Sequence, residues 1–272
     1  MLKQRLLTAA VLIPLVVLGI LVLPTSLFQI LLALVVGLAA WEWFGIIGFK
    51  TQAQMGFAMT VLLFITVLGL FLSTTAISLI SLLVWLSILL VVRYFAHRNL
   101  TERVENLFVQ AIPALIMASI VLALFWLSAV QHHQTVLGPQ QLLYVMILVW
   151  LADTGGYFAG KRWGSTALAN VISPNKTWEG VAGALVLGSI WAMFGFYLDL
   201  AGSLSLLSWL LLSLVSLFIS IIGDLFESLF KRCHNVKDSG NLLPGHGGML
   251  DRVDSLIAAI PVFVAGLYFL GA

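Results

Sequence analysis

The chain has 272 residues, of which 61% are hydrophobic and only 9% are charged. A soluble domain carries about 25% charged residues, so this composition excludes an ordinary soluble fold and predicts an all-α integral membrane protein. The net charge of +2 gives no support for nucleic-acid binding, and the single cysteine, Cys233, excludes an internal disulfide bond.

Apolar runs of about 20 residues, the length that crosses a bilayer as a helix, recur along the chain and predict about nine transmembrane helices. Turn-forming residues separate them, such as Pro24-Thr25-Ser26 after the first run and Gly202-Ser203 after the seventh. No small-residue cleavage site follows the first run, so we expect it to be retained rather than removed as a signal peptide. In chain order the predicted spans are 6–23, 27–46, 56–73, 75–95, 108–130, 142–159, 179–200, 204–230 and 252–271.

The distribution of lysine and arginine predicts the orientation of these spans, because cytoplasmic segments are enriched in both residues. With the N-terminus placed in the cytoplasm, all 13 basic residues fall on inside segments and none falls on an outside connection. An odd number of spans then places the C-terminus outside. In this topology His132 and His133 lie in an outside loop, where we expect both side chains to be solvated.

Acidic residues are distributed unevenly. Residues 1–150 contain few polar groups, and we expect them to form a scaffold of transmembrane helices, in which we favour a structural role for Glu42. Residues 151–272 carry acids at or near the predicted cytoplasmic face, and we expect them to form the catalytic region of the same continuous membrane domain. These acids are Asp153, Glu179, Asp224, Glu227, Asp238, Asp251 and Asp254.

A polar face is expected at the cytoplasmic end of the eighth predicted span. Its members are spaced three, four and seven residues apart, which places them on one side of a helix. Ionisable groups within a span are costly and usually line a cavity or a site. A plain ion pair between Glu227 and Lys231 remains an alternative. The residues of this face are Asp224, Glu227, Ser228 and Lys231.

A glycine-rich loop follows this face and contains Lys237, Asp238 and Pro244-Gly245-His246-Gly247-Gly248. Glycines let a ligand approach the backbone closely, and exposed N–H groups in such loops form concave anion sites. Asp251 and Asp254 then open the last predicted helix and face the same way. Acids in a first helical turn are also favourable without any ligand.

The combination of these residue types indicates a particular chemistry. Clustered carboxylates suit a hard metal such as Mg²⁺, whereas lysine, arginine and glycine N–H groups suit phosphate. Together they predict binding of a metal–nucleotide complex and phosphoryl or nucleotidyl transfer. The chain has no Walker A pattern, which excludes a P-loop enzyme.

A second polar segment, residues 173–180, follows the sixth predicted span and reads Ser-Pro-Asn-Lys-Thr-Trp-Glu-Gly. Lys176 can reach a phosphate from this segment, and Thr177 is expected to cap the next helix. Asp153 is the only charged residue within the sixth span itself.

Residues 228–254 read Ser-x2-Lys-Arg-x4-Lys-Asp-x-Gly-x3-Pro-Gly-His-Gly-Gly-x2-Asp-Arg-x-Asp. This pattern resembles the signature of the phosphatidate cytidylyltransferase family, also called CDP-diacylglycerol synthases. Segment 173–180 is similar to that family as well, and the motif has no departure from the family pattern. The first half of the chain has no specific match beyond its hydropathy.

The resemblance implies that CTP and phosphatidic acid react to give CDP-diacylglycerol and pyrophosphate, with Mg²⁺ and, in a paired centre, a second metal ion. It also suggests a homodimer, and we expect a cell inner membrane location with the active site facing the cytoplasm. The expected metal ligands are Asp224, Asp251 and Asp254. The expected catalytic residues are Asp224, Asp251, Lys231, Arg232, Lys237, Asp238 and His246. The expected contacts to CTP or to phosphate are Asn175, Lys176, Ser228, Lys231, Arg232, Lys237, Gly247, Gly248 and Arg252.

Two other functions share part of this pattern. A CTP-dependent lipid kinase, or a nucleotidyltransferase acting on another lipid, would also use CTP and Mg²⁺, but the long motif of residues 228–254 argues against it. A transporter is expected to carry charges near the bilayer centre in broken helices of two related halves, whereas here the charges gather at one face.

Overall fold

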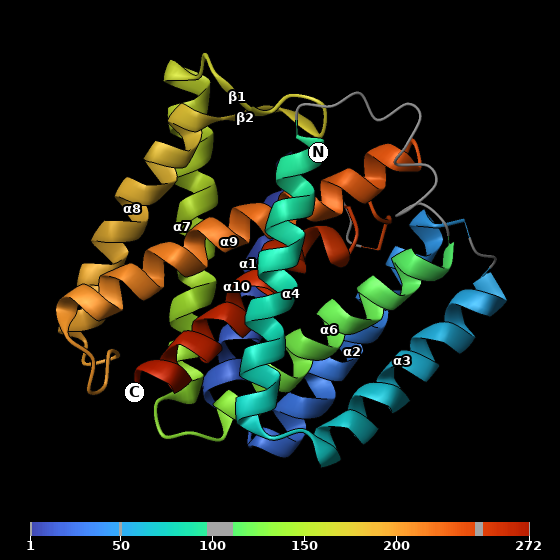
Figure 1. Ribbon diagram of the computed structural model, residues 1–272, viewed down its shortest axis with the longest axis horizontal. Coiled ribbons are helices and arrows are strands. Elements are labelled where there is room, and N and C mark those ends of the chain that lie inside the picture. The colour runs from blue at the N-terminus through green and yellow to red at the C-terminus, as the bar shows by residue number, and fades with distance from the viewer. Residues whose placement is uncertain (1, 49–50, 97–110, 243–246, 272) are drawn as a thin grey trace.

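The computed structural model describes residues 2–48, 51–96, 111–242 and 247–271. Long helices dominate it (Figure 1), because a helix pairs its own backbone groups and is therefore suited to an apolar solvent. The elements are α1 (Leu2–Leu21), α2 (Thr25–Ile46), α3 (Thr51–Phe71), α4 (Thr74–Phe95), α6 (Ala111–His133), α7 (Gly138–Trp163), β1 (Ala167–Ala169), β2 (Ser173–Thr177), α8 (Trp178–Tyr197), α9 (Leu206–Cys233) and α10 (Leu250–Leu270).

Among the described residues, eight helices are long and apolar enough to cross a membrane, namely α2 to α4 and α6 to α10. Helix α1 contributes a shorter apolar stretch, Ala10–Leu21. Each of the nine predicted spans overlaps one of these helices. The predicted fold class, an all-α protein with many membrane spans, is confirmed, while the orientation of the two termini stays a prediction.

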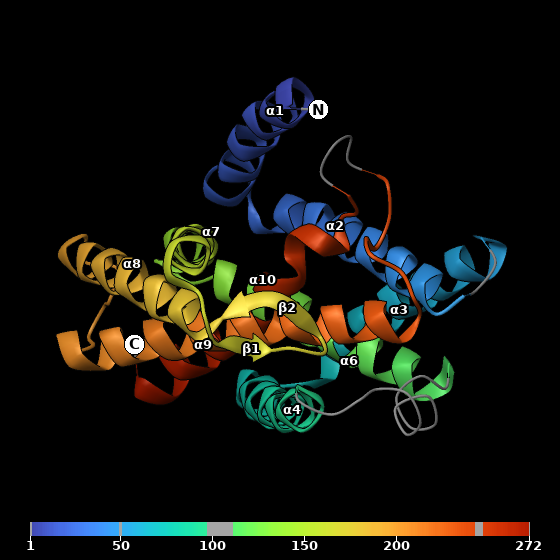
Figure 2. The same cartoon turned by 90° about the horizontal axis from the view of Figure 1, so that it is seen from above.

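Helix α10 lies at the centre of the arrangement. It packs against α9, α4, α6, α7 and α2, and 72% of its apolar span is buried, compared with 33% in α2, α4 and α8. Helices α7 and α8 pack side by side, and α1 stands to one side of the others (Figure 2). The outer helices expose large apolar side chains such as Leu63, Leu83 and Ile190, as a lipid-facing surface requires.

Hydroxyl side chains cap the N-termini of three of the described helices, α4, α8 and α9. Ser73, Thr177 and Ser205 each accept a hydrogen bond from the backbone N–H three residues further on, at 3.1 to 3.2 Å. The first N–H groups of a helix have no partner within the helix, and such caps satisfy one of them. The predicted cap of α8 by Thr177 is therefore confirmed.

Between α7 and α8 the chain forms a short antiparallel hairpin of β1 and β2, which was not predicted from the sequence. Arg232 on α9 donates from Nε to the carbonyl oxygen of Ile172 in the turn of this hairpin, at 3.3 Å. The hairpin carries Asn175 and Lys176 on β2. It is thereby held beside the C-terminal end of α9.

The prediction for His132 and His133 was wrong, because both side chains are buried. Helix α6 extends to His133, three residues beyond the predicted span, so the pair belongs to its last turn. His133 stacks on the ring of Phe28, with the ring centroids 4.1 Å apart. Its Nδ1 lies 3.1 Å from Thr25 Oγ1, and its Nε2 lies 2.9 Å from the carbonyl oxygen of Ile20. His133 thus fastens the hairpin of α1 and α2 to α6.

Candidate active site

The polar face of α9 forms as its spacing predicts. Ser228 donates from Oγ to Asp224 Oδ1 at 3.2 Å, and Lys231 donates from Nζ to Glu227 Oε2 at 2.6 Å. Both contacts join residues one helical turn apart, which confirms that the four side chains share one face. Glu227 is only 2% exposed, so this face is turned into the protein.

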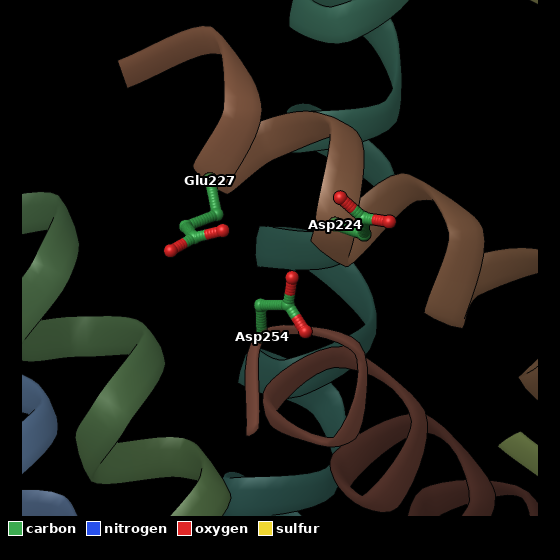
Figure 3. A group of neighbouring side chains, drawn as sticks. All are labelled: Asp224, Glu227 and Asp254. Carbon is green, nitrogen blue, oxygen red and sulfur yellow. The ribbon is translucent and has the colours of Figure 1, made fainter. Parts of the chain in front are cut away.

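Three carboxylates from two helices meet at this face. Asp224 and Glu227 on α9 and Asp254 on α10 each place an oxygen within 4.8 Å of the other two, and Figure 3 shows the three side chains close together where the two helices meet. Glu227 Oε1 is buried and has no hydrogen-bond partner among the described residues. Three anionic groups this close repel one another unless cations lie among them. Carboxylate oxygens in such a group are suitable ligands for Mg²⁺.

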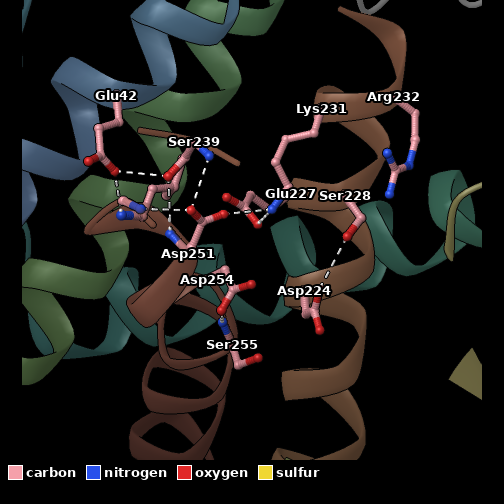
Figure 4. Close-up of polar contacts among 12 residues, drawn as sticks. Glu42, Asp224, Glu227, Ser228, Lys231, Arg232, Ser239, Asp251, Asp254 and Ser255 are labelled. Carbon is pink, nitrogen blue, oxygen red and sulfur yellow. Dashed lines mark hydrogen bonds and ion pairs between the residues drawn. The ribbon is translucent and has the colours of Figure 1, made fainter. Parts of the chain in front are cut away.

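Asp251, an expected metal ligand, lies outside this group of three. Its Oδ1 accepts from Lys231 Nζ at 2.7 Å. Its Oδ2 accepts from the backbone N–H groups of Ser239, at 3.0 Å, and Gly248, at 2.9 Å (Figure 4). Both oxygens of Asp251 therefore have protein partners. Glu227, which was not among the expected metal ligands, is the third member of the group, and the metal role of Asp251 stays a prediction.

The described parts of the glycine-rich loop lie against Asp251 and Glu42. Gly247 has a φ of +80°, which favours glycine, and a Cβ at this position would lie 2.8 Å from Asp251 Oδ2. The N–H of Gly248, expected to approach a phosphate, donates to Asp251 in this structure. Glu42 also contacts the loop and the start of α10. Glu42 was expected to have a structural role; its position as an acid within the second predicted span is a signal that could have indicated this contact.

Lys176 on β2 forms an ion pair with Asp224, so the hairpin reaches the group of three carboxylates. Asp153 on α7 is close enough to interact electrostatically with Lys176, Asp224 and Arg252. The structure thus brings segment 173–180 to the α9 face, as a shared site requires. Asn175, next to Lys176, is exposed.

Four of the remaining predicted residues have exposed side chains, namely Arg232, Lys237, Asp238 and Arg252. Arg232 also holds the hairpin through Ile172. His246 lies outside the described residues. The exposed cations have room to receive a negatively charged ligand from solvent, so their predicted roles stay predictions.

The fold and the site define a class of protein. It is a membrane protein of many spans, with clustered carboxylates that can bind a metal ion and lysines that can bind phosphate groups. Residues 3–270 match the model of the cytidylyltransferase family, and the chain belongs to that family. It is 41% identical to a phosphatidate cytidylyltransferase of Pseudomonas aeruginosa, over 100% of this chain and 98% of the relative. It is 36% identical to a phosphatidate cytidylyltransferase of Haemophilus influenzae over 99% of both chains. A Bacillus subtilis protein of the same name is 43% identical over 49% of this chain and 48% of its own length.

Proposed function

We propose that this protein transfers the CMP group of CTP to phosphatidic acid, giving CDP-diacylglycerol and pyrophosphate. The observation that carries the proposal is a group of three converging carboxylates in which Asp224 pairs with Lys176 and Glu227 pairs with Lys231. Such a site suits a reaction that brings two anionic phosphates together. The names of the relatives supply the two substrates.

Asp224, Glu227 and Asp254 would hold a Mg²⁺ ion, and the unpartnered Oε1 of Glu227 supports this choice. When bound, the ion supplies Lewis-acid stabilisation of the charge on the phosphate oxygens. Asp251 is proposed to hold Lys231 in place, since its Oδ1 accepts from Nζ at 2.7 Å.

In the proposed reaction an oxygen of the lipid phosphate attacks the α-phosphorus of CTP, and the bond to the β-phosphate breaks to release pyrophosphate. A phosphate monoester has a second pKa of about 6, so the nucleophile is largely ionised at neutral pH and needs no strong general base. Lys176 and Lys231 lower the repulsion between the two substrates. Arg232, Lys237, Arg252 and Asn175 are proposed to contact phosphate at the edge of the site.

The proposal also includes the location of the reaction. The site is proposed to face the cytoplasm, where CTP is available, in a multi-pass protein of the bacterial inner membrane. The positions of all 13 basic residues support this orientation. A homodimer, suggested by the family resemblance, is tested by light scattering of the detergent-purified protein.

The test is a transfer assay with purified protein, phosphatidic acid, Mg²⁺ and CTP labelled on the α-phosphate. We expect label in the lipid phase with an equal amount of pyrophosphate, and loss of both in Asp224→Asn. Transfer of a γ-label instead would identify a CTP-dependent lipid kinase. If neither label moves and CTP does not bind, the proposed function is wrong, and transport becomes the next hypothesis to test.

A further inference from the structure

Glu42 lies on α2, about 200 residues before the motif of residues 228–254 in the sequence. Both oxygens of its carboxylate nevertheless accept hydrogen bonds from residues of that motif. Its Oε1 accepts from the N–H of Met249 at 2.9 Å, and its Oε2 accepts from the N–H of Leu250 at 2.8 Å. Helix α10 has no side-chain cap of its own at Met249. Glu42 therefore takes the place of a cap, and its negative charge is favourable at a helix N-terminus.

Glu42 is also linked to Asp251 through Ser239. Ser239 Oγ donates to Glu42 Oε2 at 2.9 Å and accepts from the N–H of Asp251 at 3.3 Å. The N–H of Ser239 donates in turn to Asp251 Oδ2 at 3.0 Å. Asp251 in turn accepts from Lys231. A continuous chain of hydrogen bonds therefore runs from Glu42 through Ser239 and Asp251 to the ammonium group of Lys231 (Figure 4).

The glycines of the loop make room for this carboxylate. A Cβ at Gly240 would lie 2.6 Å from Glu42 Oε1, and a Cβ at Gly248 would overlap both Glu42 and Ser239 Oγ. A carboxylate that only capped α10 would not require Gly240 and Gly248 to lie so close to it. The fit of the loop around Glu42 is an observation independent of the hydrogen bonds.

We propose that Glu42 is a positioning residue, which fixes the loop at Ser239 and the first turn of α10 so that Asp251 holds Lys231 in its working position. This inference rests on the proposed function for its catalytic consequence. It assigns a role in the site to a residue from the predicted scaffold half of the chain.

The first experiment measures hydrogen–deuterium exchange of the metal-free, substrate-free protein in detergent, comparing wild type with Glu42→Gln. Glutamine keeps the size of the side chain but removes its charge and points an NH₂ group at backbone donors. We expect faster exchange in peptides covering residues 238–256 and unchanged exchange in α8. Trp41→Phe, a change at an exposed neighbour on α2, is the matched control and is expected to match wild type.

The second experiment measures kcat and KM for CTP on monodisperse protein. Loss of a supporting hydrogen-bond partner typically costs about 10- to 100-fold in activity, and we expect a fall of that size in kcat for Glu42→Gln. A merely structural role would lower the yield of folded protein without changing kcat per folded molecule. Ser239→Ala should lower kcat as well, and the double variant should fall less than the product of the single effects, because both residues act in one network.

Unchanged exchange in residues 238–256 would overturn the inference, and so would a Glu42→Gln protein with wild-type kcat. Absence of CDP-lipid formation by the wild-type protein is a different result and overturns the proposed function. The exchange comparison does not depend on catalytic activity. It therefore tests whether Glu42 fixes the loop whether or not the wild-type protein forms CDP-lipid.

Discussion

Lys231 Nζ lies 2.7 Å from Asp251 Oδ1 and so joins the C-terminal end of α9 to the first turn of α10. The same ammonium lies 2.6 Å from Glu227 Oε2. The ammonium group of Lys231 therefore forms ion pairs with two carboxylates from different helices, Glu227 on α9 and Asp251 on α10. The side chains of Glu227 and Asp251 are only 2% and 9% exposed, so solvent compensates little of their charge.

Lys231→Met is expected to abolish transfer and to destabilise the protein. Removing one partner of a buried ion pair leaves an uncompensated charge and costs about 3–5 kcal/mol. We expect a lower midpoint of thermal unfolding in detergent together with the loss of product. Lys161→Met removes an exposed lysine at the end of α7 and should change neither quantity. A Lys231→Met protein with wild-type midpoint and turnover would show that the shared ion pair is dispensable.

Removal of divalent cations by a chelator is expected to stop transfer, and added Mg²⁺ should restore it. Asp254→Asn removes one charge from the group of three carboxylates, so the Mg²⁺ concentration for half-maximal activity should rise. Even the loss of a residue that only hydrogen-bonds to a metal ligand weakens metal binding by roughly 10- to 100-fold. We expect the half-maximal Mg²⁺ concentration to rise by at least as much. Asp199→Asn, at an exposed acid after α8, is the matched control. The same Mg²⁺ dependence in Asp254→Asn and wild type would remove Asp254 from the metal site.

The face of α9 could be predicted because helical spacing alone decides which of its residues are neighbours. The cap at Thr177 could be predicted for the same reason, since its partner is three residues away. The grouping of acids across helices depends instead on how α9 and α10 pack. A Cβ at Gly223 would lie 2.7 Å from the carbonyl oxygen of Asp254, so the missing side chain lets α10 approach until Asp254 stands beside Asp224.

Contacts between distant segments could not be predicted from the sequence. Glu42 reaches a loop about 200 residues away, and no local spacing encodes that pairing. From the sequence we expected only a structural role for Glu42, and its position as an acid inside a span does not indicate which segment it contacts. Burial of His133 escaped prediction for a similar reason, because its partners Phe28, Thr25 and Ile20 come from the first two helices.

Lys176→Gln is expected to raise KM for CTP by about 10-fold, the effect of one lost charge-assisted contact to phosphate. The side chains of Lys176 and Asp224 are 27% and 28% exposed, and such partly solvated pairs contribute about 1 kcal/mol or less to stability. The midpoint of unfolding should therefore change little, in contrast to Lys231→Met. Lys176→Arg keeps the charge and should lie closer to wild type. Unchanged KM with a lower midpoint would assign Lys176 a structural role instead.

Gly248→Ala is expected to lower both stability and turnover, because the added methyl group has no space. A Cβ at this position would overlap Ser239 Oγ and the carboxylate of Glu42, and overpacking of this kind costs about 1–3 kcal/mol. Gly56→Ala on α3 is the matched control, since no heavy atom lies within 4 Å of its added Cβ. Alanine is also favoured over glycine within a helix by about 0.5–1 kcal/mol, so this control should be as stable as wild type or more so. The comparison is made by thermal unfolding and by CDP-lipid formation on the same preparations. If Gly248→Ala behaves like Gly56→Ala in both measurements, the close packing of the loop around Glu42 is not required for the reaction.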